Sequence, residues 1–489
     1  MAIELDALAR CARYGLDPGK GLATQYLICE SNRLETVPGM TAITVNRWCV
    51  HHGSDVTVFP LRDAKDRPFG AFIGIGVDEK GNRVGPPDFA AFNSKSLTFE
   101  KKFETYVSRI AGRFALLLDA GGRARLYLDP MGHMATFFNT GARLVGSSVF
   151  LTLDRPFDPG AQPMTGQSDL LQALPFGVSS DRSVRLMPGN HLLDLEHFSL
   201  RRVWPLRNTL RPVAAAKSAP VVDAMATRLR QVVGALTKDN PCLLEMDDSG
   251  NARQLLAATV DRRDTLAQVY GFARSRQDNG EPVTAARLCE AAGVAYQPLT
   301  REAALGEFGR SRADKQQRKR TFWLRTSCLC RVPVEASLNF AGLRKPGHLV
   351  LRSDGADALC VAPAGPGLST AATIEFATGK SQVDAKDAPI LSDAYETWRG
   401  GLPKSLQDRS SELIAMEWHQ PIRAVALYGQ DGPFSVSPFS DRKLMELALR
   451  LPADLRSGIA LADAIVTACD PALLAVCESE KATLATAAE

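Results

Sequence analysis

The chain has 489 residues, of which 45% are hydrophobic and 23% charged, and its formal net charge is +4. Because one hydrophobic core rarely serves more than about 250 to 300 residues, this length predicts two domains. A net charge this small does not indicate nucleic acid as a partner. No stretch approaches the roughly 20 consecutive apolar residues of a membrane span, and residues 1–15 lack the pattern of a secretory signal. We therefore expect a folded cytoplasmic protein with no membrane partner.

Ten cysteines are scattered along the chain, without a pair of CxxC motifs and without a histidine at zinc-ligand spacing. We therefore predict mostly buried, reduced thiols. Cys328 and Cys330 would lie on the same face of a strand, but they are too close in sequence for an easy disulfide.

From Trp48 to about Leu153 the sequence consists of short β-rich runs divided by turn signals. Gly121 and Gly122 mark one of these turns, of the kind that joins two antiparallel strands. The pattern predicts an antiparallel, sandwich-like half. Its runs are VTVFPL, FGAFIGIGV, RFALLLD, RARLYLD, ATFFNTG and RLVGSSVFLTL.

The segment 201–220 is rich in Pro, Arg and Ala and has neither strand nor helix periodicity, so we predict a linker there. We place the domain boundary near residue 210, which gives domains 1–210 and 211–489. After Val221, long helical patterns alternate with short apolar runs, and this alternation predicts a parallel α/β sheet. The apolar runs include CLLEM, LAQVYGF and HLVLRS.

Four groups of residues, taken in this order, resemble the asparagine synthetase family, which includes the β-lactam synthetases and the lasso-peptide cyclases. The first group comprises 112–114, 125–132, 146–148 and 186–191, in the N-terminal half. The second is the run 243–258, at the position of the family's pyrophosphate loop. The third is 353–359, similar to the family's G-E-G-x-D-E-L, and the fourth is 437–442, which leads into LMELALRLP.

This resemblance implies a fold class and a reaction. The fold is α/β plus mainly antiparallel β: an N-terminal Ntn-like domain of the class II glutamine amidotransferase type, then an adenine-nucleotide-hydrolase-like synthetase domain with a parallel sheet. The implied reaction adenylates a small-molecule or peptide carboxylate with ATP and Mg²⁺, and an amine then attacks the acyl adenylate.

The nucleophile that the family uses to hydrolyse glutamine is missing. Glutamine-hydrolysing members begin, after Met removal, with a cysteine whose α-amino group is the base. Here residue 2 is Ala2, and the nearest thiol, Cys11, lies in a helical pattern at a position suited to a buried face. We therefore expect no glutaminase activity.

The pyrophosphate loop of the family, S-G-G-x-D-S, uses small residues so that backbone N–H groups reach the phosphates. The resemblance places this remnant nucleotide loop at Asp247, Asp248, Ser249, Gly250 and Asn251. Two carboxylates thus replace small residues, and Asn251 replaces the metal-binding Asp. A shifted alignment instead puts Arg253 and Gln254 where Asp and Ser belong. A carboxylate about 4 Å from a phosphate charge costs on the order of 4 kcal/mol at an effective dielectric near 20.

The acidic loop of the family is also incomplete. Asp354 and Asp357 remain, but Ala358 replaces the second acid, and the segment 459–476 contains no Lys or Arg where the family places basic residues. Two interpretations of the acids stay open. Asp354 and Asp357 join Asp247 and Asp248 at two strand ends and hold a divalent metal, or the acids only cap helices beside a remnant loop.

We therefore expect an asparagine synthetase-like scaffold or regulatory protein whose amide-forming activity is absent or impaired. Its expected partner is an active pathway enzyme or a second copy of the chain. One alternative is an active ATP- and Mg²⁺-dependent amide ligase or cyclase with a rearranged metal site. Another is a nucleic-acid-binding module that uses the basic run 310–320, although such runs more often form a solvated helix face.

Overall fold

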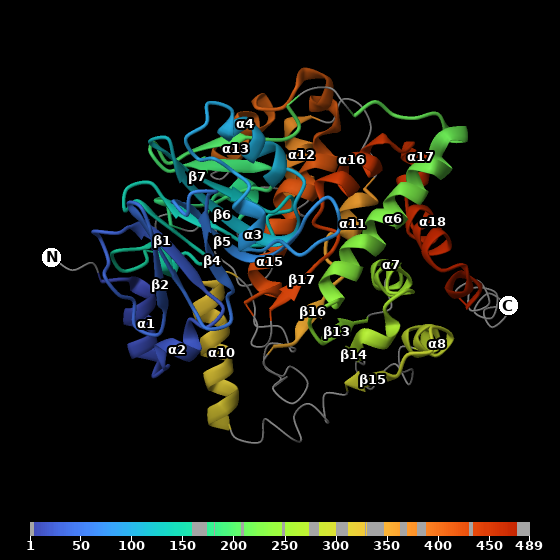
Figure 1. Ribbon diagram of the computed structural model, residues 1–489, viewed down its shortest axis with the longest axis horizontal. Helices are drawn as coiled ribbons and strands as arrows, with labels where there is room; N and C mark the ends of the chain where they lie inside the picture. The colour runs from blue at the N-terminus through green and yellow to red at the C-terminus, as the bar shows by residue number, and fades with distance from the viewer. Residues whose placement is uncertain are drawn as a thin grey trace.

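The computed structural model describes residues 4–158, 174–179, 181–206, 210–246, 250–272, 283–299, 312–327, 329, 347–361, 369–378, 388–429 and 434–476. Figure 1 shows a β-rich N-terminal half beside a C-terminal half in which helices surround a smaller sheet. The strands of the first half are antiparallel and those of the second are parallel. This agrees with the predicted two-domain α/β architecture.

The first antiparallel sheet has the strand order β10-β8-β9-β1-β3-β2. Two of its strands precede Trp48, so the predicted start of the β-rich region was wrong. β2 escaped the prediction because it is largely exposed and lacks a buried alternation. The strands are β1 (Tyr26–Glu30), β2 (Thr41–Val45), β3 (Trp48–His52), β8 (Phe137–Asn139), β9 (Leu144–Gly146) and β10 (Val184–Leu186).

The second antiparallel sheet has the order β12-β11-β7-β6-β5-β4. β6 and β7 are joined by Gly121 and Gly122, whose φ angles are +63° and +75°. Two consecutive positive φ angles are what a tight hairpin turn requires, so the predicted turn is confirmed. The strands are β4 (Val58–Arg62), β5 (Pro68–Val77), β6 (Ala111–Ala120), β7 (Arg123–Leu128), β11 (His191–Asp194) and β12 (Ser199–Arg202).

The N-terminal half is built in four layers, helices on each side of two packed sheets. Ile73 and Leu117 of the second sheet share a core with Ile28 of the first. The opposite face of the second sheet packs on helices α3 (Pro86–Phe89) and α4 (Phe99–Val107). The outer face of the first sheet packs on α1 (Asp6–Tyr14), α2 (Pro18–Gly21) and α10 (Arg312–Thr326). Because both faces of β6 are covered, the strand is buried along almost its whole length.

Helix α10 carries most of the basic run 310–320 and lies against α1 and α2, as Figure 1 shows. The Nη1 of Arg320 donates to the carbonyl of Tyr14 at 2.9 Å, and Arg325 Nε donates to the carbonyl of Gly21 at 2.9 Å. Phe322 and Leu324 are buried. The run therefore continues into a packed helix face.

The parallel sheet has the order β15-β14-β13-β16-β17. The predicted linker 201–220 proves shorter, because Arg202 ends β12 and α6 begins at Ser218. The strands are β13 (Cys242–Glu245), β14 (Leu266–Phe272), β15 (Tyr296–Leu299), β16 (Leu349–Leu351) and β17 (Ser435–Val436).

Helices account for most of the remaining C-terminal half, and none in the described part of the chain is long and apolar enough to cross a membrane. They are α6 (Ser218–Thr237), α7 (Gly250–Ala258), α8 (Val283–Ala291), α11 (Ala356–Leu359), α12 (Thr370–Thr378), α13 (Ala388–Gly400), α14 (Ser410–Ile414), the π-helical η8 (Ala415–His419), α15 (Gln420–Leu427), α16 (Arg442–Arg450), α17 (Ala453–Arg456) and α18 (Ala460–Cys469).

The turn before α16 joins the two halves. The backbone N–H of Gly112 donates to the carbonyl of Ser440 at 2.9 Å, and the Ser440 hydroxyl donates to Asp129 Oδ1 at 2.7 Å. Arg442 Nε donates to Asn190 Oδ1 at 3.0 Å. These side chains are buried, so the halves meet through hydrogen bonds shielded from water.

Candidate functional site

The strand order of the parallel sheet identifies where a ligand would be expected. If the five strands are numbered by their order along the chain, they lie in the sheet in the order third, second, first, fourth, fifth. The direction of winding therefore reverses between β13 and β16. Open parallel sheets bind their ligands outside the carboxyl ends of the two strands at such a switch point. Glu245 is the last residue of β13, and Arg352 follows β16 directly. We call this place the switch-point crevice.

An arginine bridges two carboxylates in this crevice. The Nη1 of Arg352 lies 2.7 Å from Glu245 Oε2, and its Nε lies 2.7 Å from Asp354 Oδ2. Burial alone would lower the pKa of Arg352, but the carboxylates of Asp354 and Glu245 hold it well above its ordinary value. Burial would likewise raise the pKa of Asp354, and Arg352 outweighs this and lowers it. The crevice therefore holds one guanidinium paired with two carboxyl groups.

The N-terminal half covers this ion pair. The guanidinium of Arg113 stacks on the ring of Tyr428, with 3.9 Å between its central carbon and the ring centroid. The Tyr428 hydroxyl donates to Asp354 Oδ2 at 3.4 Å. Burial raises the pKa of Tyr428 well above its ordinary value and lowers that of Arg113 to about 10. A side chain at Gly355 would require Met131 to move, because its first carbon would lie 2.4 Å from the Met131 sulfur.

Asp357 is also engaged by basic and amide groups. Arg423 forms an ion pair with its Oδ2, and Gln420 Nε2 donates to its Oδ1 at 3.3 Å. The same Gln420 lies 3.4 Å from a ring nitrogen of His133 through its amide oxygen. Asp354 and Asp357, the two predicted metal ligands that the structure describes, therefore both have arginine partners. Across the described residues, no group of three or more His, Cys, Asp or Glu side chains could hold a metal ion.

The remnant nucleotide loop is described only in part. Asp247, Asp248 and Ser249 lie outside the described residues, while Gly250 and Asn251 open helix α7. In the alternative alignment, Arg253 lies 3.8 Å from Asp463 and Gln254 is fully buried. That Asp247 and Asp248 bind a divalent metal therefore remains a prediction.

Cys11 cannot easily serve as a nucleophile. It is buried on helix α1, as predicted, and burial raises the pKa of its thiol to about 11. A thiol with such a pKa carries almost no thiolate at neutral pH. Cys328 and Cys330 lie outside the described residues.

Sequence reasoning missed Glu245 and Arg352. A weak signal was present, because each is a charged residue at the carboxyl end of a short apolar run, CLLEM and HLVLRS. Charged residues at the end of a buried strand need a partner. The comparisons with known proteins add no assignment, since no family model and no curated protein matches this chain.

Proposed function

We propose that this chain is a non-catalytic scaffold or regulatory protein with the two-domain architecture of the asparagine synthetase family. Two features support the resemblance. A four-layer, antiparallel N-terminal half precedes a parallel sheet, as an amidotransferase-like and a synthetase-like domain would. The segments 353–359 and 437–442 lie next to β16 and before α16, where they face the N-terminal half.

The ion pairs of Arg352 are the observation that carries the proposal. A family member with activity would need Mg²⁺ and the phosphates of ATP at the carboxyl ends of these strands. At an effective dielectric near 20, a guanidinium about 4 Å from a divalent ion opposes it by about 8 kcal/mol. The carboxylates of Glu245 and Asp354 would attract the ion, but each gives one oxygen to a hydrogen bond with Arg352. Mg²⁺ would therefore have to displace the guanidinium before those oxygens could bind it.

An active ligase would require Arg352 to leave its carboxylates and turn to the phosphates of the nucleotide. Arginine can bind phosphate in this way. The change would leave two partly buried acids to be neutralised by the metal. The two proposals therefore differ in a measurable way, because only the active enzyme links nucleotide binding to Mg²⁺.

Calorimetry with ATP in the presence of Mg²⁺ and in the presence of EDTA tests the proposal. We expect no binding that requires Mg²⁺ with a dissociation constant below about 1 mM, which corresponds to some 4 kcal/mol. We also expect no pyrophosphate release with a panel of carboxylates and amines. Mg²⁺-dependent binding that disappears in Asp354→Asn, or pyrophosphate release that does so, would establish the ligase instead.

A further inference from the structure

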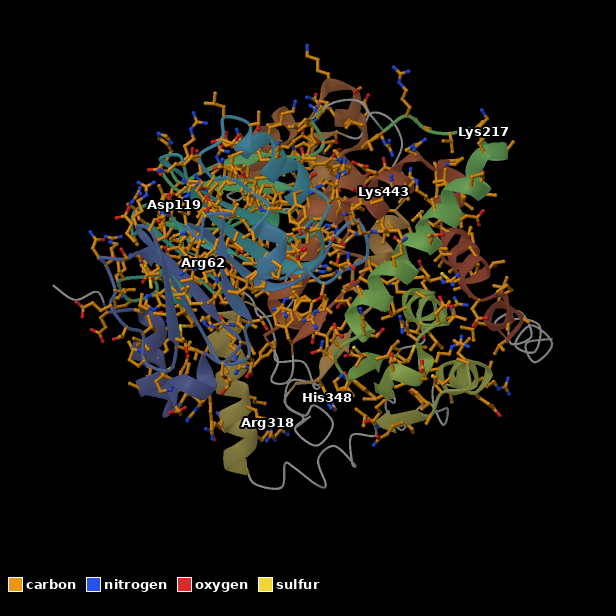
Figure 2. All side chains as sticks on the ribbon, viewed as in Figure 1. Arg62, Asp119, Lys217, Arg318, His348 and Lys443 are labelled. Carbon is orange, nitrogen blue, oxygen red and sulfur yellow. The ribbon has the colours of Figure 1, made fainter. Side chains whose placement is uncertain are left out.

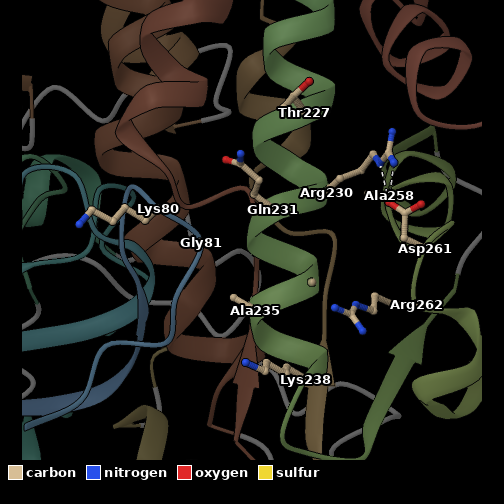
Figure 3. Close-up of a pocket in the computed structure, with 11 residues that line it drawn as sticks. Lys80, Gly81, Thr227, Arg230, Gln231, Ala235, Lys238, Ala258, Asp261 and Arg262 are labelled. Atoms are coloured by element: carbon tan, nitrogen blue, oxygen red, sulfur yellow. Dashed lines mark hydrogen bonds and ion pairs between the residues drawn. The ribbon is translucent and has the colours of Figure 1, made fainter. Parts of the chain in front are cut away.

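A basic groove lies on the side of helix α6, away from the switch-point crevice (Figure 3). It is open to solvent and has a volume of about 500 Å³, within the range of small-molecule sites. Its floor is α6, and its walls are the turn after β5 and the residues after α7. It is lined by Lys80, Gly81, Thr227, Arg230, Gln231, Gly234, Ala235, Lys238, Ala258, Asp261 and Arg262.

The lining carries four basic side chains and one acidic side chain. Asp261 is paired with Arg230, at 2.5 Å from its Nη2. Within the described part of the chain, no carboxylate lies at ion-pair distance from Lys80, Lys238 or Arg262. The groove therefore has three positive charges that its own residues do not neutralise.

Two of these charges belong to residues that follow the carboxyl ends of helices α6 and α7, Lys238 and Arg262. In Figure 3 the guanidinium of Arg262 points toward α6. Lys238 directly follows Thr237, the last residue of α6, and its side chain extends to the other side of the helix, whereas Lys80 points away from α6 at the rim. Gly234 leaves room beside the Nε of Arg262, since a side chain carbon at this position would lie 4.0 Å from it. Gln231 and Thr227 add polar groups along the same helix.

The wall formed by the N-terminal half is held in place. Arg228 donates from Nη1 to the carbonyls of Asp78 and Glu79, at 2.9 and 3.2 Å. The Oδ1 of Asp78 accepts hydrogen bonds from the backbone N–H groups of Lys80 and Asn82, so this carboxylate stabilises its own turn. Glu79, the other acid of this turn, pairs with Arg109 at 2.5 Å, so neither acid forms an ion pair with Lys80.

Stabilisation of the helices explains part of this pattern. Lys238 and Arg262 follow the carboxyl ends of α6 and α7, where a cation is favourable. Stabilisation of the helices does not explain why Lys80, on the opposite wall, also lacks a carboxylate partner. It also does not explain the groove between Lys80 and the other two basic residues. We propose that the groove binds a small molecule with a diphosphate or similarly charged phosphate group, held by Arg262 and Lys238.

This site is separate from the crevice of the proposed function. Lys238 lies just before β13, whose far end carries Glu245, and a strand of this length spans about 13 Å. Arg262 likewise follows the end of α7 that is opposite Gly250. Occupation of the groove requires no Mg²⁺ and none of the residues of the crevice.

Titration of the full chain with inorganic pyrophosphate in EDTA tests this proposal. We expect a dissociation constant below about 1 mM, weakened at least about tenfold in the double variant Lys238→Gln with Arg262→Gln. A matched control, Lys217→Gln with Lys443→Gln, removes the same charge from exposed positions outside the lining, both labelled in Figure 2, and should bind within about twofold of the wild type.

Several outcomes decide the proposal. Equal weakening in both double variants would mean that net charge alone attracts the anion, and no binding by the wild type would also overturn the site. Asp261→Asn releases Arg230 and should tighten binding of pyrophosphate. ATP in EDTA should bind through the same residues. If the chain were an active ligase after all, its Mg²⁺-dependent binding of ATP would persist in the Lys238 and Arg262 variant. Failure of either proposal can thus be recognised separately.

Discussion

The guanidinium of Arg202 lies 2.6 Å from a carboxylate oxygen of Glu417, and both side chains are buried where the two halves meet. Trp398 Nε1 donates to the other carboxylate oxygen at 2.8 Å. The Nε and Nη2 of Arg202 are buried and have no hydrogen-bond partner among the residues that the structure describes. The pair therefore joins strand β12 to the π-helical segment η8 without satisfying all of its own donors.

Breaking this pair from one side should destabilise the protein strongly. Arg202→Met or Glu417→Leu leaves one buried charge without its partner, which costs about 3 to 5 kcal/mol. The double variant removes both charges, so no charge has to be taken out of water when it folds. Its loss of unfolding free energy should therefore be far smaller than the sum of the losses in the two single variants. Denaturant unfolding of all four proteins measures the coupling, and strictly additive losses would contradict it.

The stability contributed by Glu417 should depend on pH. Burial raises the pKa of this carboxyl above its ordinary value of 4.5, and Arg202 offsets the shift only in part. The folded protein thus binds the proton more tightly than the unfolded chain. Relative to Glu417→Gln, the wild type should lose stability as pH rises above 4.5 and through the folded pKa. Unfolding free energies of both proteins between pH 4 and 8 check this, and a constant difference would count against it.

Replacing Arg352 should create a response to divalent metal. Arg352→Ser leaves Glu245 and Asp354 facing each other, so we expect a loss of about 3 to 5 kcal/mol at neutral pH. The loss should shrink as pH falls and the acids are protonated, and Mg²⁺ or Mn²⁺ should restore part of it. Arg352→Lys keeps the charge and should show no such rescue. Thermal melts with and without metal distinguish these cases, and equal rescue of the wild type would refute the assigned role of Arg352.

Asp441 should contribute to the stability of the protein through two separate interactions. Its Oδ1 accepts from the N–H of Lys443 as the N-cap of α16, and its Oδ2 lies 2.5 Å from Arg228 Nε. Asp441→Asn keeps a capping oxygen but loses the buried ion pair, whereas Asp441→Ala loses both. The alanine variant should therefore be less stable than the asparagine variant by about 1 kcal/mol. Equal stability of the two variants would show that the cap contributes nothing.

Glutamine hydrolysis should be absent, and Cys11 should resist alkylation in the folded protein. Burial raises the pKa of its thiol to about 11, so the reactive thiolate is rare at pH 7. Glutamate release and mass spectrometry after iodoacetamide treatment measure the two properties, with the denatured protein as the positive control for alkylation. Activity that vanishes in Cys11→Ala would contradict the expectation.

The local pattern of residues determined much of the fold. The apolar runs 242–246, 266–272 and 348–353 alternate with helical periodicity, and each contains a parallel strand. Gly121 and Gly122 specified their own turn, since only glycine adopts two positive φ angles without strain. These features depend on neighbours in sequence, so the sequence was sufficient to predict them.

The tertiary structure alone decided what the charged residues do. Arg352 and Glu245 are 107 residues apart, and nothing local in either segment specifies that they meet. Arg228 and Asp441 are separated by 213 residues, and the basic face of α10 finds the carbonyls of α1 and α2 only after the chain has folded back. A charge acts over a few ångströms, so its partner depends on the packing of strands and helices that bring distant segments together.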